Sequence, residues 1–198
     1  MPAYPAYPDL SVLLLAGGRG QRMAGQDKGL LPWRGKPLIA WVAEQVRPLT
    51  DDLLISCNRN NAQYAAHADR LVADPNPDYL GPLAGILTGL RAARHEQLLI
   101  LPCDAPCIDR DLLDDLLALA GDKPVMVRQG DFWEPLFCIV PRVLLDDLER
   151  AWLEGVRSPQ RWLQPLKPHA LVCAVGDRRL ANFNTPDWLE EENGQTGG

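Results

Sequence analysis

The stretch that decides the fold of this chain is residues 11–28, which read SVLLLAGGRGQRMAGQDK. It opens with a continuous apolar run, Ser11–Leu15, which is typical of a strand buried on both faces of a parallel sheet. A glycine-rich segment that carries Arg19, Arg22 and Lys28 follows the run directly. A buried strand leading into such a loop indicates an α/β domain with a ligand site beyond the strand's carboxyl end.

The rest of the chain alternates short apolar runs with helical patterns, as a parallel sheet covered by crossover helices does. The patterns predict strands at 53–57, 70–72, 98–101 and 171–175, and helices at 37–49, from 82, from 109, over 141–154 and from 158. The runs at 125–127 and 136–140 are too close for a helical crossover, so they are expected to pair antiparallel. The predicted fold is α/β: a three-layer, Rossmann-like arrangement whose mostly parallel sheet contains an antiparallel strand.

Length and composition favour one globular domain. The chain has 198 residues, 46% of them hydrophobic, which suffices for one sizeable core. We expect a single domain over 1–198, with an ordered core at about 10–190 and flexible tails at 1–9 and 193–198.

Charge and cysteine usage exclude several classes of function. The net charge of −6 argues against nucleic acid or a membrane surface as a partner, because both select basic proteins. No apolar run is long enough for a membrane span, and the N-terminus lacks the features of a signal peptide. We therefore expect a cytoplasmic protein with reduced cysteines, which fit no zinc spacing and mostly lie in apolar runs.

The glycine-rich loop suits a triphosphate. Glycines let several backbone N–H groups converge on one anion, and the three cations of the loop add positive charge. The loop is not a Walker motif, and Met23 stands where the dinucleotide fingerprint needs a third glycine. A plain surface turn is the alternative interpretation.

Two aspartates follow other predicted strands and should share the same edge of the sheet. Asp104 lies between Pro102 and Pro106, and a carboxylate there can hold Mg²⁺ together with phosphate oxygens. Asp74 could accept hydrogen bonds from a base or a sugar. Both residues could instead be ordinary turn or capping aspartates.

Four ordered motifs, taken together, resemble one enzyme family. They are Leu15–Met23 with Asp27–Gly29, then Gly81–Gly85, then Pro102–Pro106, and then Asn182–Pro186. The chain resembles the bacterial molybdenum cofactor guanylyltransferases over about residues 10–189. The first motif is shared by many nucleotidyltransferases, whereas the ordered set is far more specific.

The resemblance implies a nucleotidyltransferase that transfers GMP from GTP to the molybdenum–molybdopterin cofactor, with Mg²⁺ as its metal. The implied GTP-binding residues are Leu15, Ala16, Gly17, Lys28, Asp74 and Asp104, and Asp104 would also bind the metal. Arg22, Lys28 and Asp104 are the catalytic candidates, because phosphoryl-type transfer needs positioning and charge neutralisation more than a nucleophilic side chain. The sequence Ala16–Gly18 favours guanine over cytosine. Whether Ser56 or Asn58 replaces an Asn of some relatives stays open.

The pterin side rests on later segments. Asn182 and Asn184 lie in the last motif, and Arg157 and Arg161 could pair with phosphate oxygens. For the two arginines a solvated helix face is the alternative. The expected partners are GTP, the molybdenum–molybdopterin cofactor, and the chaperones or molybdoenzymes that receive the product.

Three other functions remain as alternatives. One is a nucleotidyltransferase acting on a sugar phosphate or a polyol phosphate, and another is a cytidylyltransferase of the same cofactor. The third is a non-catalytic nucleotide sensor on the same fold, against which Lys28 and Asp104 argue.

Overall fold

The computed structural model describes residues 7–16, 27–73 and 81–183. Four of the expected site residues, Gly17, Arg22, Asp74 and Asn184, lie outside these ranges. The expected tails also fall largely outside them.

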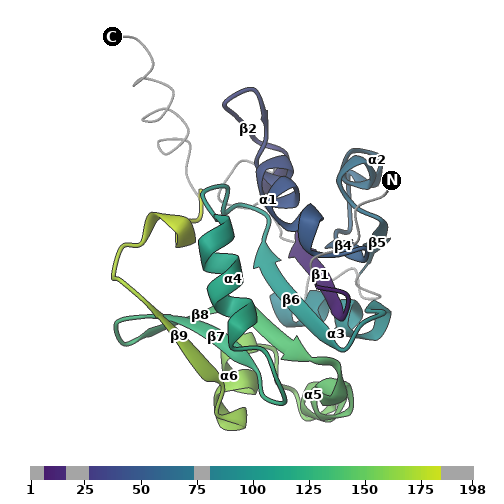
Figure 1. The fold of residues 1–198 in the computed structure, drawn as a ribbon. Helices are drawn as coiled ribbons and strands as arrows, with labels where there is room; N and C mark the ends of the chain where they lie inside the picture. The colour runs from purple at the N-terminus through teal and green to yellow at the C-terminus, as the bar shows by residue number, and fades with distance from the viewer. Residues whose placement is uncertain (1–6, 17–26, 74–80, 184–198) are drawn as a thin grey trace.

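The centre of the molecule is a 7-stranded sheet with the order β5-β4-β1-β6-β8-β7-β9 (Figure 1). The strands are β1 Leu10–Leu15, β4 Leu53–Ser56, β5 Arg70–Val72, β6 Gln97–Pro102, β7 Val125–Gln129, β8 Phe132–Pro141 and β9 His169–Cys173. Strands β5, β4, β1 and β6 run parallel, β8 runs antiparallel to both neighbours, and β9 runs parallel to β7. The predicted mostly parallel sheet with an antiparallel strand is confirmed.

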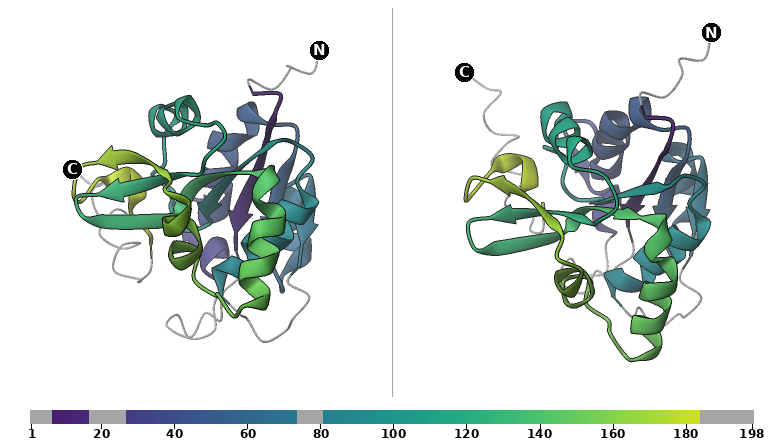
Figure 2. Two further views of the ribbon diagram at one scale, coloured as in Figure 1. Left: turned by 90° about the horizontal axis from the view of Figure 1, so that it is seen from below. Right: turned by 60° about the horizontal axis from the view of Figure 1, so that its bottom comes forward.

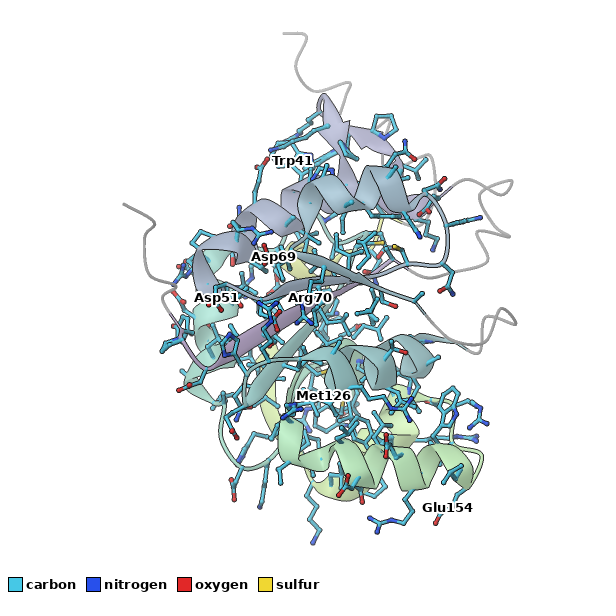
Figure 3. All side chains as sticks on the ribbon, turned by 90° about the vertical axis from the view of Figure 1, so that its right-hand side faces the viewer. Trp41, Asp51, Asp69, Arg70, Met126 and Glu154 are labelled. Carbon is cyan, nitrogen blue, oxygen red and sulfur yellow. The ribbon has the colours of Figure 1, made fainter. Side chains whose placement is uncertain are left out.

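Helices cover both faces of this sheet (Figures 1 and 2). They are α1 Leu38–Val46, α2 Asn61–Tyr64, α3 Pro82–Ala92, α4 Arg110–Ala118, α5 Leu145–Leu153 and α6 Pro159–Leu163. Helices α1 and α4 bury their apolar residues against one face, and α3, α5 and α6 bury theirs against the other. Figure 3 views the sheet from its β5 edge, with Trp41 of α1 on one side and Glu154, after α5, on the other. The three-layer arrangement is therefore confirmed.

Strand β1 shows why a continuous apolar run is needed at the centre of the sheet. Leu10, Val12 and Leu14 pack into the core beneath α1 and α4, whereas Leu13 and Leu15 pack beneath α3. Every residue of the strand is buried. Side chains alternate between the two faces of a strand, so a strand covered on both faces has no position for a solvated side chain.

Several element boundaries differ from the predictions. The helix expected at 37–49 is α1 followed by a turn of 3₁₀ helix, and the one expected at 141–154 begins with such a turn. The last strand is His169–Cys173 rather than 171–175, because β9 pairs with β7 from Val125 opposite His169. The 3₁₀ turns of the described residues, these two included, are η2 Lys28–Leu30, η3 Arg47–Leu49, η4 Ala65–His67, η5 Arg142–Leu144, η6 Gln164–Leu166 and η7 Arg178–Leu180.

Two short elements carry no pattern that predicts them from the sequence. The first is a hairpin of β2 Pro32–Trp33 and β3 Lys36–Pro37, which turns through Arg34 and Gly35 at positive φ. The second is α2, which has four residues and no periodicity to reveal it. Elements this short are determined by their tertiary contacts rather than by local pattern.

Residues at the start of the described chain are attached to the domain. The backbone N–H of Tyr7 donates to the carbonyl of Leu49, and its hydroxyl donates to Asp114 at 3.2 Å. Gln97 donates to the carbonyl of Asp9. Residues 7–9, expected in the flexible tail, thus make specific contacts.

The five cysteines are free thiols, and all except the half-buried Cys107 are buried, as expected for small core residues. Burial raises the pKa of Cys57 to about 11, so this thiol stays protonated. Within the described part of the chain, no helix is both apolar enough and long enough to span a membrane.

A buried carboxylate organises the amino-terminal edge of the sheet. Asp52, directly before β4, accepts hydrogen bonds from Ser11 Oγ at 2.6 Å and from the backbone N–H of Arg94 at 3.0 Å, and it pairs with Arg70. Its side chain is 0% exposed. Burial by itself would raise the pKa of Asp52, but the bonds from Ser11, Arg70 and Arg94 outweigh burial and lower it.

Candidate active site

The carboxyl ends of the parallel strands meet at one edge of the sheet. Leu15 at the end of β1 is level with Ser56 of β4 and with Pro102 of β6, and Ser56 is level with Val72 of β5. The loops after these strands therefore share one edge, as the sequence predicted. Such an edge is where open α/β sheets bind ligands.

Backbone pairing continues past the strand ends and fixes the start of two loops. The N–H of Ala16 donates to the carbonyl of Ser56 at 2.9 Å, and the N–H of Cys103 donates to the carbonyl of Leu15 at 3.1 Å. Leu15 and Ala16, expected to contact GTP through their backbone, thus lie beside the segment that carries Asp104. Both are buried, so their role would be to shape the site rather than to add charge.

Lys28 and Asp104 come together at this edge. The Nζ of Lys28 lies 3.7 Å from Oδ2 of Asp104, and the two side chains are 31% and 12% exposed. They come from separate elements, because Lys28 opens η2 whereas Asp104 follows β6. The sequence named both residues, and the structure joins them as an ion pair.

The environment of Asp104 differs from that of an ordinary surface carboxylate. Burial raises the pKa of Asp104, and the nearby Lys28 ammonium and the backbone hydrogen bond lower it only in part. An incompletely compensated, buried carboxylate at a ligand edge is typical of functional sites.

The donor set around Asp104 fits Mg²⁺. Among the described residues, no group of three or more His, Cys, Asp and Glu could enclose a metal ion. Mg²⁺ is commonly bound through one or two carboxylates plus substrate phosphates, rather than by an all-protein cage. The buried carboxylate of Asp104 suits that mode of binding.

The last described residues run alongside Asp104. The N–H of Phe183 donates to the backbone carbonyl of Asp104 at 2.8 Å, and the Phe183 ring is buried against Trp33. Asn182, a candidate for the pterin side, is therefore brought to the same edge. Its Oδ1 is buried and accepts no hydrogen bond from any residue in the described ranges.

The start of α3 closes another side of the site. A Cβ on Gly85 would lie 2.8 Å from Ser56 Oγ and 2.9 Å from a Leu15 methyl carbon, so the helix approaches β1 and β4 closely. Ser56 is buried there, while Asn58 lies beyond the strand. Ser56 thus lies at this edge as the last residue of β4, and Asn58 lies in the loop that follows it.

Arg157 and Arg161 lie apart from the ion pair. They line a surface hollow of about 490 Å³ together with Glu154, Gly155, Val156 and Ser158. Arg157 stacks over Trp152 at 4.0 Å and donates to two backbone carbonyls, so its guanidinium is already engaged. The hollow borders the start of α3, because a Cβ on Gly81 would lie 3.8 Å from the Arg157 carbonyl.

Sequence reasoning missed the role of Asp27, the residue before Lys28. Its carboxylate is buried and accepts hydrogen bonds from Tyr64 and Asn60, and Arg59 lies 3.4 Å away. Proximity to Lys28 was the available signal, but α2, which supplies Tyr64, has no periodicity that predicts it.

A comparison of the chain with known protein families gives one match that spans most of it. Residues 12–171 match the model of the MobA-like NTP transferase domain. The chain belongs to the MobA-like NTP transferases. Relatives that are 55% to 61% identical to this chain are named molybdenum cofactor guanylyltransferase. A molybdenum cofactor guanylyltransferase of Ectopseudomonas mendocina (strain ymp) is 61% identical over 189 residues, which cover 96% of this chain and 94% of that protein.

Solved structures of MobA-like NTP transferases and more distant enzymes share the fold. Molybdopterin-guanine dinucleotide biosynthesis protein A from Archaeoglobus fulgidus has a TM-score of 0.72 at 26% identity, covering 93% of this chain and 99% of that one. The 2-C-methyl-D-erythritol 4-phosphate cytidylyltransferase of Thermus thermophilus has a TM-score of 0.69 at 15% identity, covering 94% and 98%. The second likeness concerns the fold alone. The chain is thus a nucleotidyltransferase that is similar in sequence to guanylyltransferases.

Proposed function

We propose that this protein transfers GMP from GTP to the molybdenum–molybdopterin cofactor, giving the guanine dinucleotide form and pyrophosphate. The observation that carries the proposal is the Lys28–Asp104 pair, 3.7 Å apart at the carboxyl edge of the sheet. The 61% identity to a protein named molybdenum cofactor guanylyltransferase supports the choice of substrates.

The reaction is a displacement at the α-phosphorus of GTP. An oxygen of the pterin's terminal phosphate forms a bond to that phosphorus, and the bond to the bridging oxygen of the leaving pyrophosphate breaks. Negative charge accumulates on the departing oxygen and on the α-phosphate. Lys28 neutralises part of this charge, and it does so from a site whose buried walls strengthen the electrostatic interaction.

Mg²⁺ would be held by Asp104, together with oxygens of the triphosphate. When bound, it would neutralise phosphate charge and orient the leaving group. The adjacent Lys28 ammonium favours the ionised form of Asp104 and opposes the effect of burial, which raises the pKa of Asp104. Removal of divalent cations with a chelator should abolish turnover, and added Mg²⁺ should restore it.

Leu15, Ala16, Gly17 and Asp74 complete the proposed GTP site, and Arg22 the proposed catalytic set. The buried Leu15 and Ala16 would present backbone groups to the nucleotide. Gly17, Arg22 and Asp74 lie outside the described residues, so their assignment rests on the sequence motifs.

The test of the activity is pyrophosphate release from GTP, CTP, ATP and UTP, each measured with and without the molybdenum-loaded pterin. We expect release that requires both GTP and the pterin. Equal use of CTP would favour a cytidylyltransferase of the same cofactor, and turnover with a sugar phosphate or polyol phosphate alone would favour those classes. GTP binding without turnover under any condition would indicate a nucleotide sensor.

The second substrate is proposed to approach past Asn182 and Asn184. These residues follow Asp104 in the sequence, whereas Lys28 precedes it. The buried, unpartnered Oδ1 of Asn182 supports this assignment within the described part of the chain. The hollow at Arg157 and Arg161 is the other candidate, and the start of α3 connects it to the same edge of the sheet.

Two variants distinguish these positions. Asn182→Ala should spare GTP affinity in calorimetry and weaken product formation at low pterin concentration. The double change Arg157→Ala and Arg161→Ala should have the smaller effect, because the Arg157 guanidinium is already bonded to its own helix end. An equal loss of GTP affinity and pterin use in Asn182→Ala would contradict the division into two sides.

A further inference from the structure

The segment that carries Lys28 is fixed by a buried carboxylate, that of Asp27. Asp27 directly precedes the η2 turn, and its side chain makes no capping bond to that turn. The carboxylate points instead to the segment after β4, where Asn60 Nδ2 donates to Oδ2 at 3.0 Å. The hydroxyl of Tyr64 donates to the other carboxylate oxygen, Oδ1.

These contacts are protected from solvent. The Asp27 side chain is 6% exposed, and Tyr64 is 0% exposed. Arg59 adds a cation 3.4 Å from Asp27 Oδ2. A carboxylate that receives donors on both oxygens has one orientation available, since rotation would leave buried polar groups unpaired.

Gly29, in the same turn, packs closely against its neighbours. A Cβ at this position would lie 2.6 Å from the Tyr64 hydroxyl and 3.1 Å from the sulfur of Cys103. The turn is therefore packed between Tyr64 and the residue before Asp104. Lys28 thus lies between two fixed neighbours, and its side chain reaches Asp104 at 3.7 Å.

We propose that Asp27, held by Tyr64 and Asn60, is a positioning residue that fixes the backbone of Lys28 so that its ammonium meets the phosphates beside Asp104. Asp27 touches no substrate and acts only through Lys28. This inference rests on the proposed function for the meaning of Lys28, but the positioning itself is a property of the free protein.

Two variants each disrupt a different part of the hydrogen bonding around Asp27. Asp27→Asn keeps an acceptor for Tyr64 but places an amide against Asn60 and Arg59. Tyr64→Phe removes the other donor and leaves the ring in place. Because each change weakens a hydrogen bond to a charged group and so loosens the position of Lys28, each variant should lower kcat for GMP transfer by about tenfold. Tyr7→Phe, which removes a hydroxyl bonded to Asp114, is the matched control and should keep wild-type turnover.

A double-mutant cycle with Lys28→Ala separates positioning from general support of the fold. If Asp27 acts through Lys28, adding Asp27→Asn to Lys28→Ala should lower the residual kcat no further. Multiplicative losses in the double variant would overturn the proposal, because Asp27 would then act independently of Lys28.

A second measurement does not depend on turnover. Reductive methylation with formaldehyde, followed by mass spectrometry, reports how accessible and how firmly paired each lysine is. Lys36 is the internal reference, since it is 30% exposed and paired with Glu44, while Lys28 is 31% exposed. In Asp27→Asn and Tyr64→Phe, Lys28 should be methylated severalfold faster relative to Lys36. An unchanged ratio in both variants would overturn the proposal, even if they unfold at lower temperature.

The two measurements also separate this inference from the proposed function. If the wild-type protein fails to transfer GMP in the presence of Mg²⁺ and pterin, the proposed function is wrong. The methylation ratio would still decide whether Asp27 holds Lys28 in place.

Discussion

Two buried aspartates lie at opposite edges of the same sheet and have opposite surroundings. Asp52, at the amino-terminal edge, accepts bonds from Ser11, Arg70 and the backbone of Arg94. Asp104, at the carboxyl edge, has Lys28 at 3.7 Å as its ion-pair partner. The pKa of Asp52 is lowered, whereas the pKa of Asp104 is raised.

The difference separates a residue that stabilises the fold from one that we propose binds a ligand. Every oxygen of Asp52 is already used, so the ionised form is the form that stabilises the native state. Burial raises the pKa of Asp104, so its ionisation costs stability, and a bound cation would offset that cost. Burial alone therefore does not indicate whether a carboxylate is structural or functional; the hydrogen bonds and charges around it must be compared as well.

The largest effect on stability is expected from Asp52→Ala. Removing one partner of a buried ion pair costs about 3–5 kcal/mol, because Arg70 and the N–H of Arg94 lose their acceptor. A chain of this size should lose about 2–4 °C in Tm for each kcal/mol. Calorimetric or circular-dichroism melting would measure this loss. Asp51→Ala is the control, because the neighbouring Asp51 side chain is 64% exposed. Equal losses in the two variants would refute the structural role of Asp52.

Asp104→Ala should lower turnover without lowering stability. The loss of one strong electrostatic contact at the reacting phosphates should lower kcat by about 10²–10³-fold, or about 2–4 kcal/mol. The variant should melt no lower than the wild type, since no core residue depends on this carboxylate. Steady-state kinetics at saturating GTP and Mg²⁺ would measure the loss. Near-normal kcat in this variant would remove Asp104 from the mechanism.

The opposite pKa shifts predict opposite signs in a pH series. Because the pKa of Asp104 is raised in the folded state, its ionisation destabilises the free protein above that pKa, so Asp104→Asn should melt higher than the wild type at pH 7. The gain should disappear as the pH falls through the folded pKa toward the ordinary value of 3.8.

Asp52→Asn should behave in the reverse sense. Asp52 has a lowered pKa, so its stabilising contribution is present above 3.8 and is lost as the pH falls through the folded pKa. This variant should melt lower than the wild type at pH 7, with a deficit that shrinks in acid. Melting curves of both Asn variants across the acid range would check the pair, and a deficit in both at pH 7 would contradict the comparison.

The smallest effect is expected at a third aspartate, Asp109. It caps α4 by accepting from the N–H of Leu112 at 2.9 Å, and it follows Asp104 closely in the sequence. Asp109→Ala should cost about 1 kcal/mol of stability, as for an N-cap, and leave kcat unchanged. Melting and kinetics on one preparation would show both. A large loss of kcat would mean that proximity to the site, rather than the environment of Asp104, explains its importance.

Much of the fold follows from the sequence because the deciding signals are local. The apolar run of β1, the period of α3 and the close spacing of β7 and β8 each predict an element and its pairing. The boundaries of β9 and the existence of α2 depend on tertiary contacts, and no short pattern records them. Periodic apolar patterns predict the elements that form the core, but they do not predict an element of four residues such as α2.

The candidate site was predictable where a residue follows a buried strand. Asp104 was identified by its place after an apolar run, and Lys28 by its place at the end of a glycine-rich loop. Asp27 was identified only as part of a motif, and its role was not, because its partners Tyr64 and Asn60 belong to a later segment of the chain. The role of a residue that acts through its neighbour is visible in its three-dimensional contacts rather than in a sequence motif.

The hydrogen bond between Phe183 and the carbonyl of Asp104 has a consequence for synthesis. This contact joins the middle of the chain to its last described residues, and closing such long loops is slow relative to forming local structure. On the ribosome, β1, β4 and β6 emerge before Asn182 does. A nascent chain could therefore pair β1, β4 and β6 before Asn182 and Phe183 reach the segment that carries Asp104.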